Sequence, residues 1–233
     1  MHSHSRQHVF RALARTLTGL AALPFFLHGQ ALAEGQTSPL PNPVMDQSIA
    51  KNPANQSAIF AGGCFWGVQA VFQHVKGVVS ATSGYAGGTK GTAKYPLVSS
   101  GTTGHAEAVK VVYDPARVSY GQLLKVFFSV AHNPTQLNRQ GPDAGTQYRS
   151  EIFVATSEQK KIAEAYIGQL VAARVYPEKI VTRVSSPTEF YPAEAYHQNY
   201  ATLHPDEPYI AINDLPKLDH LKIQFPELYK QAE

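Results

Sequence analysis

The segment 57-SAIFAGGCFWGVQAVFQHV-75 predicts a strand, a tight turn and a helix in direct succession. Ser57–Ala61 has the length and apolar character of a short strand, and Gly62-Gly63 ends it. Apolar side chains then recur at helical spacing, at Val68, Val71, Phe72 and Val75. A helix is therefore expected to begin close to Cys64, and the fold is expected to grow from this strand–turn–helix unit.

Strands and helices continue to interleave along the rest of the chain. Further strands are predicted at Val78–Tyr85, Ala108–Tyr113, Ile152–Ala155 and Ile180–Val184. Two capping boxes, Ser119 with Gln122 and Thr156 with Gln159, predict the starts of two more helices. This interleaving favours an α/β or α+β layered domain, although the pattern alone leaves the strand order open.

Composition and proline content predict one folded domain with flanking segments. The chain has 233 residues, of which 43% are hydrophobic and 10% aromatic, enough for one substantial core. Residues 34–56 hold four prolines among Ser, Asn and Gln and are expected to form a flexible linker. The domain is predicted to span 57–213. The tail, 214–233, carries an apolar set typical of a short docked helix: Leu218, Leu221, Phe225 and Leu228.

The first 33 residues have the pattern of an export signal. A basic start is followed by an apolar run from Leu17 to Leu27 and by the small-residue site Ala31-Leu32-Ala33. The run is too short to span a bilayer. We therefore expect an exported, periplasmic protein with no membrane span in the mature chain. A transit peptide leading to an organelle lumen is the alternative, because the Arg-containing start lacks acids.

The charge of the chain argues against nucleic-acid partners. Residues 1–33 hold three of the 20 Lys and Arg and none of the 17 Asp and Glu, so the remainder carries 17 of each. A neutral body offers no electrostatic footprint for nucleic acid or for an anionic membrane.

Cys64 is the only cysteine, so no disulfide can form within the chain. Most free cysteines are inert core residues. Here, however, glycines precede the cysteine, and the only tryptophan, Trp66, lies two positions on. The start of a helix offers unpaired N–H groups and a positive dipole end, which predicts a thiol pKa below the usual value of about 8.5.

The motifs around Cys64 resemble those of the A-type peptide methionine sulfoxide reductases. The matching segments, in the family's order, are Gly62–Gly67, Ser83–Gly88, Tyr95-Pro96, Gly104–Val109, His132–Thr135, Gly141–Ser150 and Tyr196–Tyr200. The resemblance implies a ferredoxin-like plait with a mixed sheet in a two-layer α/β sandwich. It also implies reduction of methionine S-sulfoxide, free or in oxidised proteins, without a bound cofactor or metal.

The resemblance implies the two central roles. Cys64 matches the nucleophile that attacks the sulfoxide sulfur and becomes a sulfenic acid. Glu107 matches the acid that protonates the sulfoxide oxygen. A carboxyl in a partly apolar pocket has a raised pKa, which suits that role.

The remaining roles are also carried over from the family. Tyr95 and Tyr148 match hydroxyls that hydrogen-bond the sulfoxide oxygen, and Asp143 matches a carboxylate that orders the site. Phe65 and Trp66 match the apolar wall that holds the substrate's S-methyl group.

This sequence departs from many family members because it lacks a second cysteine near the C-terminus. Recycling of the sulfenic acid is therefore expected to use an external thiol, such as a thioredoxin-like protein, a glutaredoxin or a small dithiol. Nothing in the sequence indicates an obligate partner, and a monomer is expected.

Two other function classes fit parts of the sequence. A cysteine acyltransferase or hydrolase could use Cys64 with His197 as base, oriented by Asp143 or Asn199. A non-enzymatic binding module would make Cys64 incidental. The family uses no histidine as its main catalyst, so His132 and His197 are interpreted as structural or supporting residues.

Overall fold

A computed structural model describes residues 40–47, 54–186 and 188–231. The predicted export signal lies outside these residues. Within them, no helix is both long enough and apolar enough to cross a membrane.

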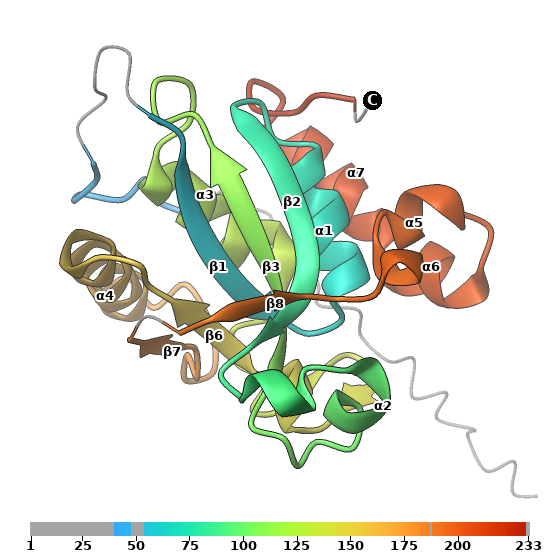
Figure 1. Cartoon of the computed structure of the whole chain (residues 1–233). Coiled ribbons are helices and arrows are strands. Elements are labelled where there is room, and N and C mark those ends of the chain that lie inside the picture. The colour runs from blue at the N-terminus through green and yellow to red at the C-terminus, as the bar shows by residue number, and fades with distance from the viewer. Residues whose placement is uncertain (1–39, 48–53, 187, 232–233) are drawn as a thin grey trace, which may run out of the picture. The chain divides into compact units, whose positions relative to one another are not determined.

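Six strands form one mixed sheet (Figure 1). The strands are β1 (Gln56–Gly62), β2 (Val78–Ala86), β3 (Ala106–Tyr113), β6 (Ser150–Phe153), β7 (Arg183–Ser185) and β8 (Phe190–Pro192). Their order is β7-β6-β1-β3-β2-β8. Only the edge pair β6–β7 is parallel, while the other neighbours run antiparallel. The expectation of an α+β fold with a mixed sheet is confirmed.

Two crossovers place helices on one face of this sheet. Helix α1 (Phe65–Gln73) connects β1 to β2, and α3 (Tyr120–Val126), extended by the π-helix η2 (Phe127–Ala131), leads from β3 toward β6. In chain order, the four core strands are β1, β2, β3 and β6. Their order in the sheet, β6-β1-β3-β2, places the fourth strand beside the first and the third between the first and the second. This is the arrangement of the ferredoxin-like plait.

The core lies between the sheet and these helices. The ring of Phe60 on β1 stacks on Phe72 of α1 and on Phe127 of η2, with 5.0 Å between centroids in both pairs. Val68, Val71 and Phe72 are buried, as their helical spacing predicted. The same packing fixes the end of β1 and the start of α1, where Cys64 lies.

One capping box forms completely and the other only in part. The Ser119 hydroxyl accepts from the Gln122 N–H while the Gln122 side chain accepts from the Ser119 N–H. At the start of α4 (Ser157–Ala172), Thr156 accepts from the Gln159 N–H. The Gln159 amide instead bonds the Ala155 N–H and the Ser57 carbonyl, which ties α4 to β1.

The strand predicted at Ile180–Val184 is displaced toward its C-terminal end. Val181 donates its N–H to the Pro134 carbonyl in a loop contact, and pairing with β6 begins only at Arg183. The three-residue strand β8 was not predicted, because it is too short to show an alternating pattern.

The remaining elements are short segments and the C-terminal helices. They are η1 (Lys90–Thr92), α2 (Tyr95–Val98), β4 (Arg139–Gln140), β5 (Asp143–Ala144), η3 (Thr146–Tyr148), η4 (Ala195–His197), α5 (Tyr200–Leu203), α6 (Pro208–Asn213) and α7 (Leu215–Gln224). The helix predicted in the tail is α7. It packs against α1 and η2, and Leu221, Phe225 and Leu228 are buried there.

Part of the expected linker packs on the domain. Leu40 is buried, and the Asp46 carboxylate accepts from the Gly121 N–H at 2.8 Å and from the Ser119 hydroxyl. The expectation of a loose segment was therefore wrong for residues 40–47, because both contacts are made with α3, 70 or more positions away, which local composition cannot indicate.

Candidate active site

A cavity of about 190 Å³ opens at the junction of β1 and α1. Its lining residues are Cys64, Phe65, Trp66, Tyr95, Glu107, Asp143, Tyr148 and Tyr209. All seven site residues predicted from the sequence thus lie together, and Tyr209 is an addition. One water occupies about 30 Å³ in the liquid, so the cavity has room for only a few waters. A space of this size suits a short side chain and is too small for a folded segment.

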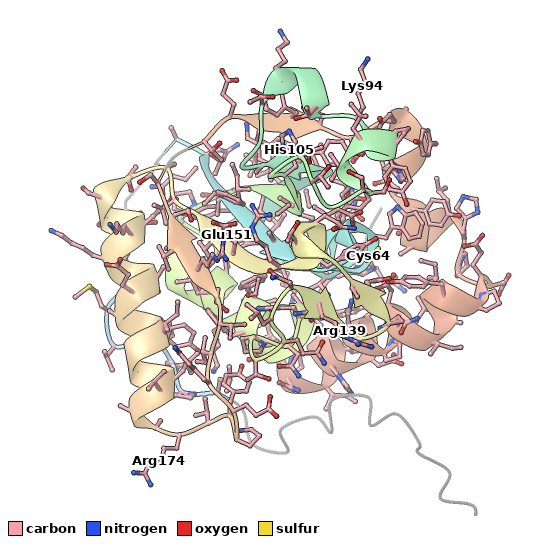
Figure 2. All side chains as sticks on the ribbon, turned by 90° about the horizontal axis from the view of Figure 1, so that it is seen from below. Cys64, Lys94, His105, Arg139, Glu151 and Arg174 are labelled. Carbon is pink, nitrogen blue, oxygen red and sulfur yellow. The ribbon has the colours of Figure 1, made fainter. Side chains whose placement is uncertain are left out.

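Cys64 lies at the N-cap of α1, inside the body of the domain (Figure 2). Its side chain is 9% exposed, whereas those of Lys94 and Arg174 extend outward. The preceding Gly63 has φ of +91°, and a Cβ there would lie 2.5 Å from the Gln140 side chain. Glycine is therefore required for the turn that delivers the cysteine into the cavity.

Glu107 faces the start of α1 from the neighbouring strand β3. Its Oε2 accepts the Phe65 N–H at 3.1 Å, and its side chain is almost fully buried, at 2% exposure. Burial is the main cause that raises the pKa of Glu107 to about 8, opposed by the Phe65 N–H and reinforced by Asp143 and Asp214. The carboxyl is thus mainly protonated at neutral pH and holds a proton for donation.

Burial is also the main influence on the pKa of the Cys64 thiol. The pKa of Cys64 is raised well above its usual value, first by desolvation and next by Glu107, while the Trp66 N–H and Lys217 act in the opposite direction. The lowered pKa expected from the helix start was wrong for the substrate-free site, because desolvation outweighs the helix N-terminus.

The two predicted tyrosines reach the cavity from two short helical segments, Tyr95 from α2 and Tyr148 from η3. The Glu194 carboxylate accepts the Tyr95 N–H at 3.0 Å and the Tyr85 hydroxyl at 2.8 Å, which fixes the start of α2 against the sheet. Burial raises the pKa of both Tyr95 and Tyr148. Both side chains therefore stay protonated and can donate hydrogen bonds to an oxygen in the cavity.

Asp143 is held by Tyr209, the lining residue that the sequence did not indicate. The Tyr209 hydroxyl donates to Asp143 Oδ2 at 2.5 Å, and burial raises the pKa of Asp143. Tyr209 lies on α6, beyond the last matching motif, so no local pattern distinguished it from a packing residue.

An aromatic cluster fixes the wall formed by Trp66. The indole stacks on Tyr200, with centroids 3.9 Å apart and planes at 12°, and meets Tyr209 edge-on. Its Nε1 donates to Nδ1 of His197 at 3.2 Å. The indole therefore has a stacking partner and a hydrogen-bond partner, which hold it beside Cys64.

The histidines do not form a nucleophile–base pair with Cys64. His197 uses Nδ1 for Trp66 and does not line the cavity, and no hydrogen bond joins it to Cys64 within the described ranges. His132 contacts the Phe127 carbonyl at 3.0 Å and Ser150 Oγ at 2.7 Å, and burial lowers its pKa to about 3. The structural interpretation of both histidines agrees with these contacts, and the geometry does not favour an acyltransferase.

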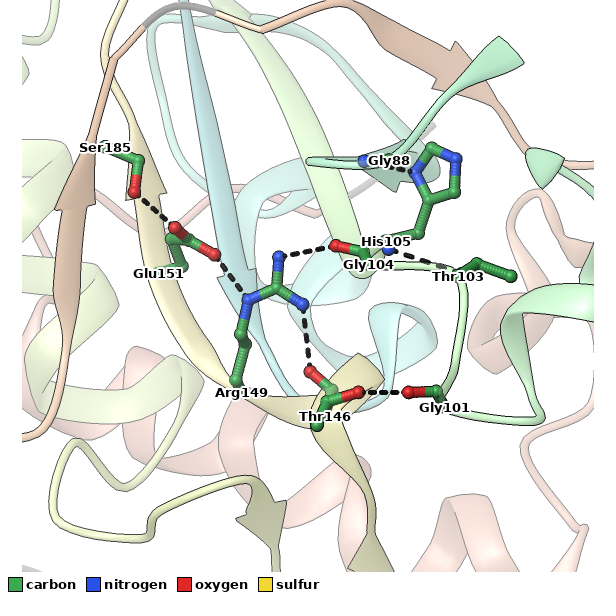
Figure 3. A network of polar contacts seen from close by, with 9 residues as sticks. All are labelled: Gly88, Gly101, Thr103, Gly104, His105, Thr146, Arg149, Glu151 and Ser185. Carbon is green, nitrogen blue, oxygen red and sulfur yellow. Dashed lines mark hydrogen bonds and ion pairs between the residues drawn. The ribbon is translucent and has the colours of Figure 1, made fainter. Parts of the chain in front are cut away.

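The buried Arg149 guanidinium joins the loop that contains Gly104 to the turn that contains Thr146 (Figure 3). The Arg149 guanidinium donates to Glu151, to the Thr146 carbonyl at 3.0 Å and to the Gly104 carbonyl at 3.0 Å. Gly104 precedes β3, and Thr146 begins η3. The guanidinium therefore holds the loop before the acid beside the turn that presents Tyr148.

We expect Arg149→Met to destabilise the fold by about 3 kcal/mol, because it leaves the Glu151 carboxylate buried without its partner. Urea unfolding followed by circular dichroism measures this change. Lys160→Met is the matched control, since Lys160 is about half exposed and 3.9 Å from Glu164, and its loss is expected to cost at most about 0.5 kcal/mol. Equal losses for the two variants would contradict the account.

Comparisons with known proteins agree on one family. The family model described as "Peptide methionine sulfoxide reductase" matches residues 56–228. A protein of Mesorhizobium japonicum named peptide methionine sulfoxide reductase MsrA 2 is 60% identical over 187 residues, covering 80% of this chain and 95% of the relative. One of the same name from Synechocystis is 50% identical over 193 residues, covering 82% of this chain and 90% of the relative.

Solved structures with similar folds carry related names. Methionine sulfoxide reductase A of Corynebacterium diphtheriae is 37% identical with a TM-score of 0.56, covering 66% of this chain and 77% of that one. Mxr1 from Saccharomyces cerevisiae in reduced form is 31% identical with a TM-score of 0.57, covering 69% and 92%.

Proposed function

The chain belongs to the peptide methionine sulfoxide reductase family and acts as a peptide-methionine (S)-S-oxide reductase; we propose that Cys64 is its nucleophile and Glu107 its proton donor. The observation that carries this assignment is the shared cavity, where the only thiol of the chain and a buried, protonated carboxyl line the same space. Sulfoxide reduction requires a soft nucleophile at sulfur and a proton for the departing oxygen.

The proposed reaction transfers one oxygen atom from substrate to enzyme. Cys64 sulfur attacks the sulfoxide sulfur, Glu107 protonates the oxygen, and the Glu107 carboxylate then receives the proton that the thiol loses. The oxygen then passes to Cys64 sulfur, and both the S–O bond of the substrate and the S–S bond formed in the attack break. The sulfoxide is reduced by two electrons to methionine, and the thiol is oxidised by two electrons to a sulfenic acid.

The other lining residues bind and orient the substrate in this proposal. Tyr95 and Tyr148 donate hydrogen bonds to the sulfoxide oxygen as negative charge grows there. Phe65 and Trp66 contact the S-methyl group, and Asp143 holds Tyr209 in place. Because these contacts are arranged asymmetrically about the sulfur, they select one sulfoxide epimer.

We propose that an external thiol regenerates the enzyme. With one cysteine in the chain, the sulfenic acid cannot form an internal disulfide. A first external thiol attacks Cys64 sulfur and releases water, and a second thiol breaks the mixed disulfide, so a dithiol supplies both electrons. A thioredoxin-like protein, a glutaredoxin or a small dithiol has this chemistry.

Export remains a proposal based on residues 1–33. A periplasmic location requires the external dithiol to be supplied outside the cytoplasm. The substrates proposed for that compartment are oxidised methionines of exported proteins and free methionine sulfoxide.

Selectivity for one epimer provides the test. With racemic methionyl sulfoxide and excess dithiothreitol, we expect about half of the substrate to be consumed, because each reductase type accepts one epimer. Chiral chromatography of the remainder should show the R epimer alone. Without dithiothreitol, consumption should stop near one equivalent per enzyme. Consumption of both epimers, or of neither, would count against the proposed function.

A further inference from the structure

Two charged residues of the C-terminal segment lie against the first turn of the cysteine's helix. A Cβ built on Gly67 would lie 2.0 Å from Asp214 Oδ1 and 2.7 Å from Lys217 Nζ. Gly67 is three residues after Cys64, on the first turn of α1. Absence of a side chain at this position is therefore what admits the carboxylate and the ammonium.

The two groups form an ion pair in which the carboxylate is buried, the ammonium is partly exposed, and one carboxylate oxygen is left over. Lys217 Nζ is 2.9 Å from Asp214 Oδ1, and Asp214 is 1% exposed. Asp214 Oδ2 is buried and has no hydrogen-bond partner among the residues that the structure describes. A buried carboxylate in this state is costly, so its presence against the first turn of the cysteine's helix calls for a functional explanation.

The charge around Cys64 is otherwise acidic or neutral. The titratable groups that line its cavity are Glu107 on β3, Asp143 on β5, Tyr95 on α2, Tyr148 on η3 and Tyr209 on α6. Asp214 at the start of α7 and Lys217 within α7 lie against Gly67 on the helix that Cys64 begins. Lys217 supplies the positive charge in this group. Among these groups of the described residues, the Lys217 ammonium is the one whose charge can balance negative charge that develops on the sulfur, beside the hydrogen bond from the Trp66 N–H.

We propose that Asp214 and Lys217 form a charge-balancing pair that governs how readily the Cys64 thiol ionises and attacks its substrate. This inference rests on the proposed role of Cys64 as nucleophile. Lys217 offsets the Asp214 charge in the resting site and stabilises the sulfur as it becomes negative. Asp214 holds the ammonium at the first turn of α1. Both are positioning residues, because they act through Cys64.

The pair predicts opposite effects for its two members. Lys217→Met leaves the Asp214 charge unbalanced beside the sulfur, so the thiol should ionise less readily. Asp214→Asn leaves the ammonium unbalanced, so the thiol should ionise more readily. A purely structural role would instead move both variants in the same direction.

The test measures alkylation of Cys64 by iodoacetamide as a function of pH, on the folded full chain. Because the protein has one cysteine, all label reports on that sulfur. We expect Lys217→Met to raise the apparent thiol pKa by about one unit and to slow alkylation at neutral pH by about tenfold. Asp214→Asn should shift the pKa downward, and the double variant should return close to the unmodified protein.

Lys222→Met is the matched control, because Lys222 is exposed on the same helix, and its profile should match that of the unmodified protein. Asp214→Asn preserves side-chain shape and carries the test if Lys217→Met fails to fold. Shifts of the same sign in both single variants, or no shift in either, would overturn the pairing. A Cys64 that resists the reagent even in the unmodified protein would instead overturn the proposed function itself.

Discussion

Cys64→Ser is expected to lower the rate of methionine sulfoxide reduction by at least about a thousandfold. A hydroxyl is a weak nucleophile toward sulfur and cannot carry the transferred oxygen as a sulfenic acid does. The chain has no other thiol that could replace Cys64. Release of methionine from methionyl sulfoxide with excess dithiothreitol measures the loss.

The serine variant should keep its fold, because the two side chains have similar size and Cys64 makes no disulfide. Circular dichroism and thermal unfolding provide the control. Activity within tenfold of the unmodified protein would show that Cys64 is not the nucleophile.

Glu107→Gln has the second-largest expected effect, a loss of roughly a hundredfold to a thousandfold in kcat/KM at neutral pH. The amide preserves the shape of the side chain but has no acidic proton to transfer. The carboxyl of Glu107 has a pKa raised to about 8, so its protonated form predominates below that pH and is lost above it. The unmodified enzyme should therefore lose activity as the pH rises through about 8, and the variant should lack this step.

Glu164→Gln is the control for this substitution, since Glu164 is about half exposed on α4 and does not line the cavity. Its rate and pH profile should be unchanged. A Glu107→Gln variant with the same rate and the same pH step as the unmodified enzyme would exclude the acid role.

Local patterns in the sequence predicted the parts of the fold that local physics determines. The run from Ser57 to Val75 specifies β1, the glycine turn and α1 through side-chain periodicity and backbone freedom at Gly63. The capping box at Ser119 likewise needs only residues three positions apart. The seven predicted site residues meet in one cavity. They could be named from the sequence because each lies in a motif that the family resemblance identifies.

The residues that the sequence did not indicate act over long separations. Glu194 binds the Tyr95 N–H 99 positions away, and the Tyr209 hydroxyl binds Asp143 66 positions away. Asp214 reaches Gly67 from the tail. Each is a common polar residue in an ordinary local setting, and only the tertiary fold gives it a partner.

The pKa of the Cys64 thiol likewise could not be predicted from the local sequence. A helix start is visible in the sequence and predicts an easily ionised Cys64. Burial among aromatic residues and the nearness of Glu107 are tertiary properties, and they reverse the sign of the pKa shift.

The central claim is that the sulfoxide oxygen passes to Cys64, and a single turnover without reductant tests it most directly. The protein is mixed with an excess of methionine S-sulfoxide labelled in its oxygen, and methionine is counted while the modified residue is located by mass spectrometry after trapping with a sulfenic-acid reagent. The account predicts about one methionine per enzyme and the labelled oxygen on Cys64 alone. Methionine formed while Cys64 carries no labelled oxygen would contradict it.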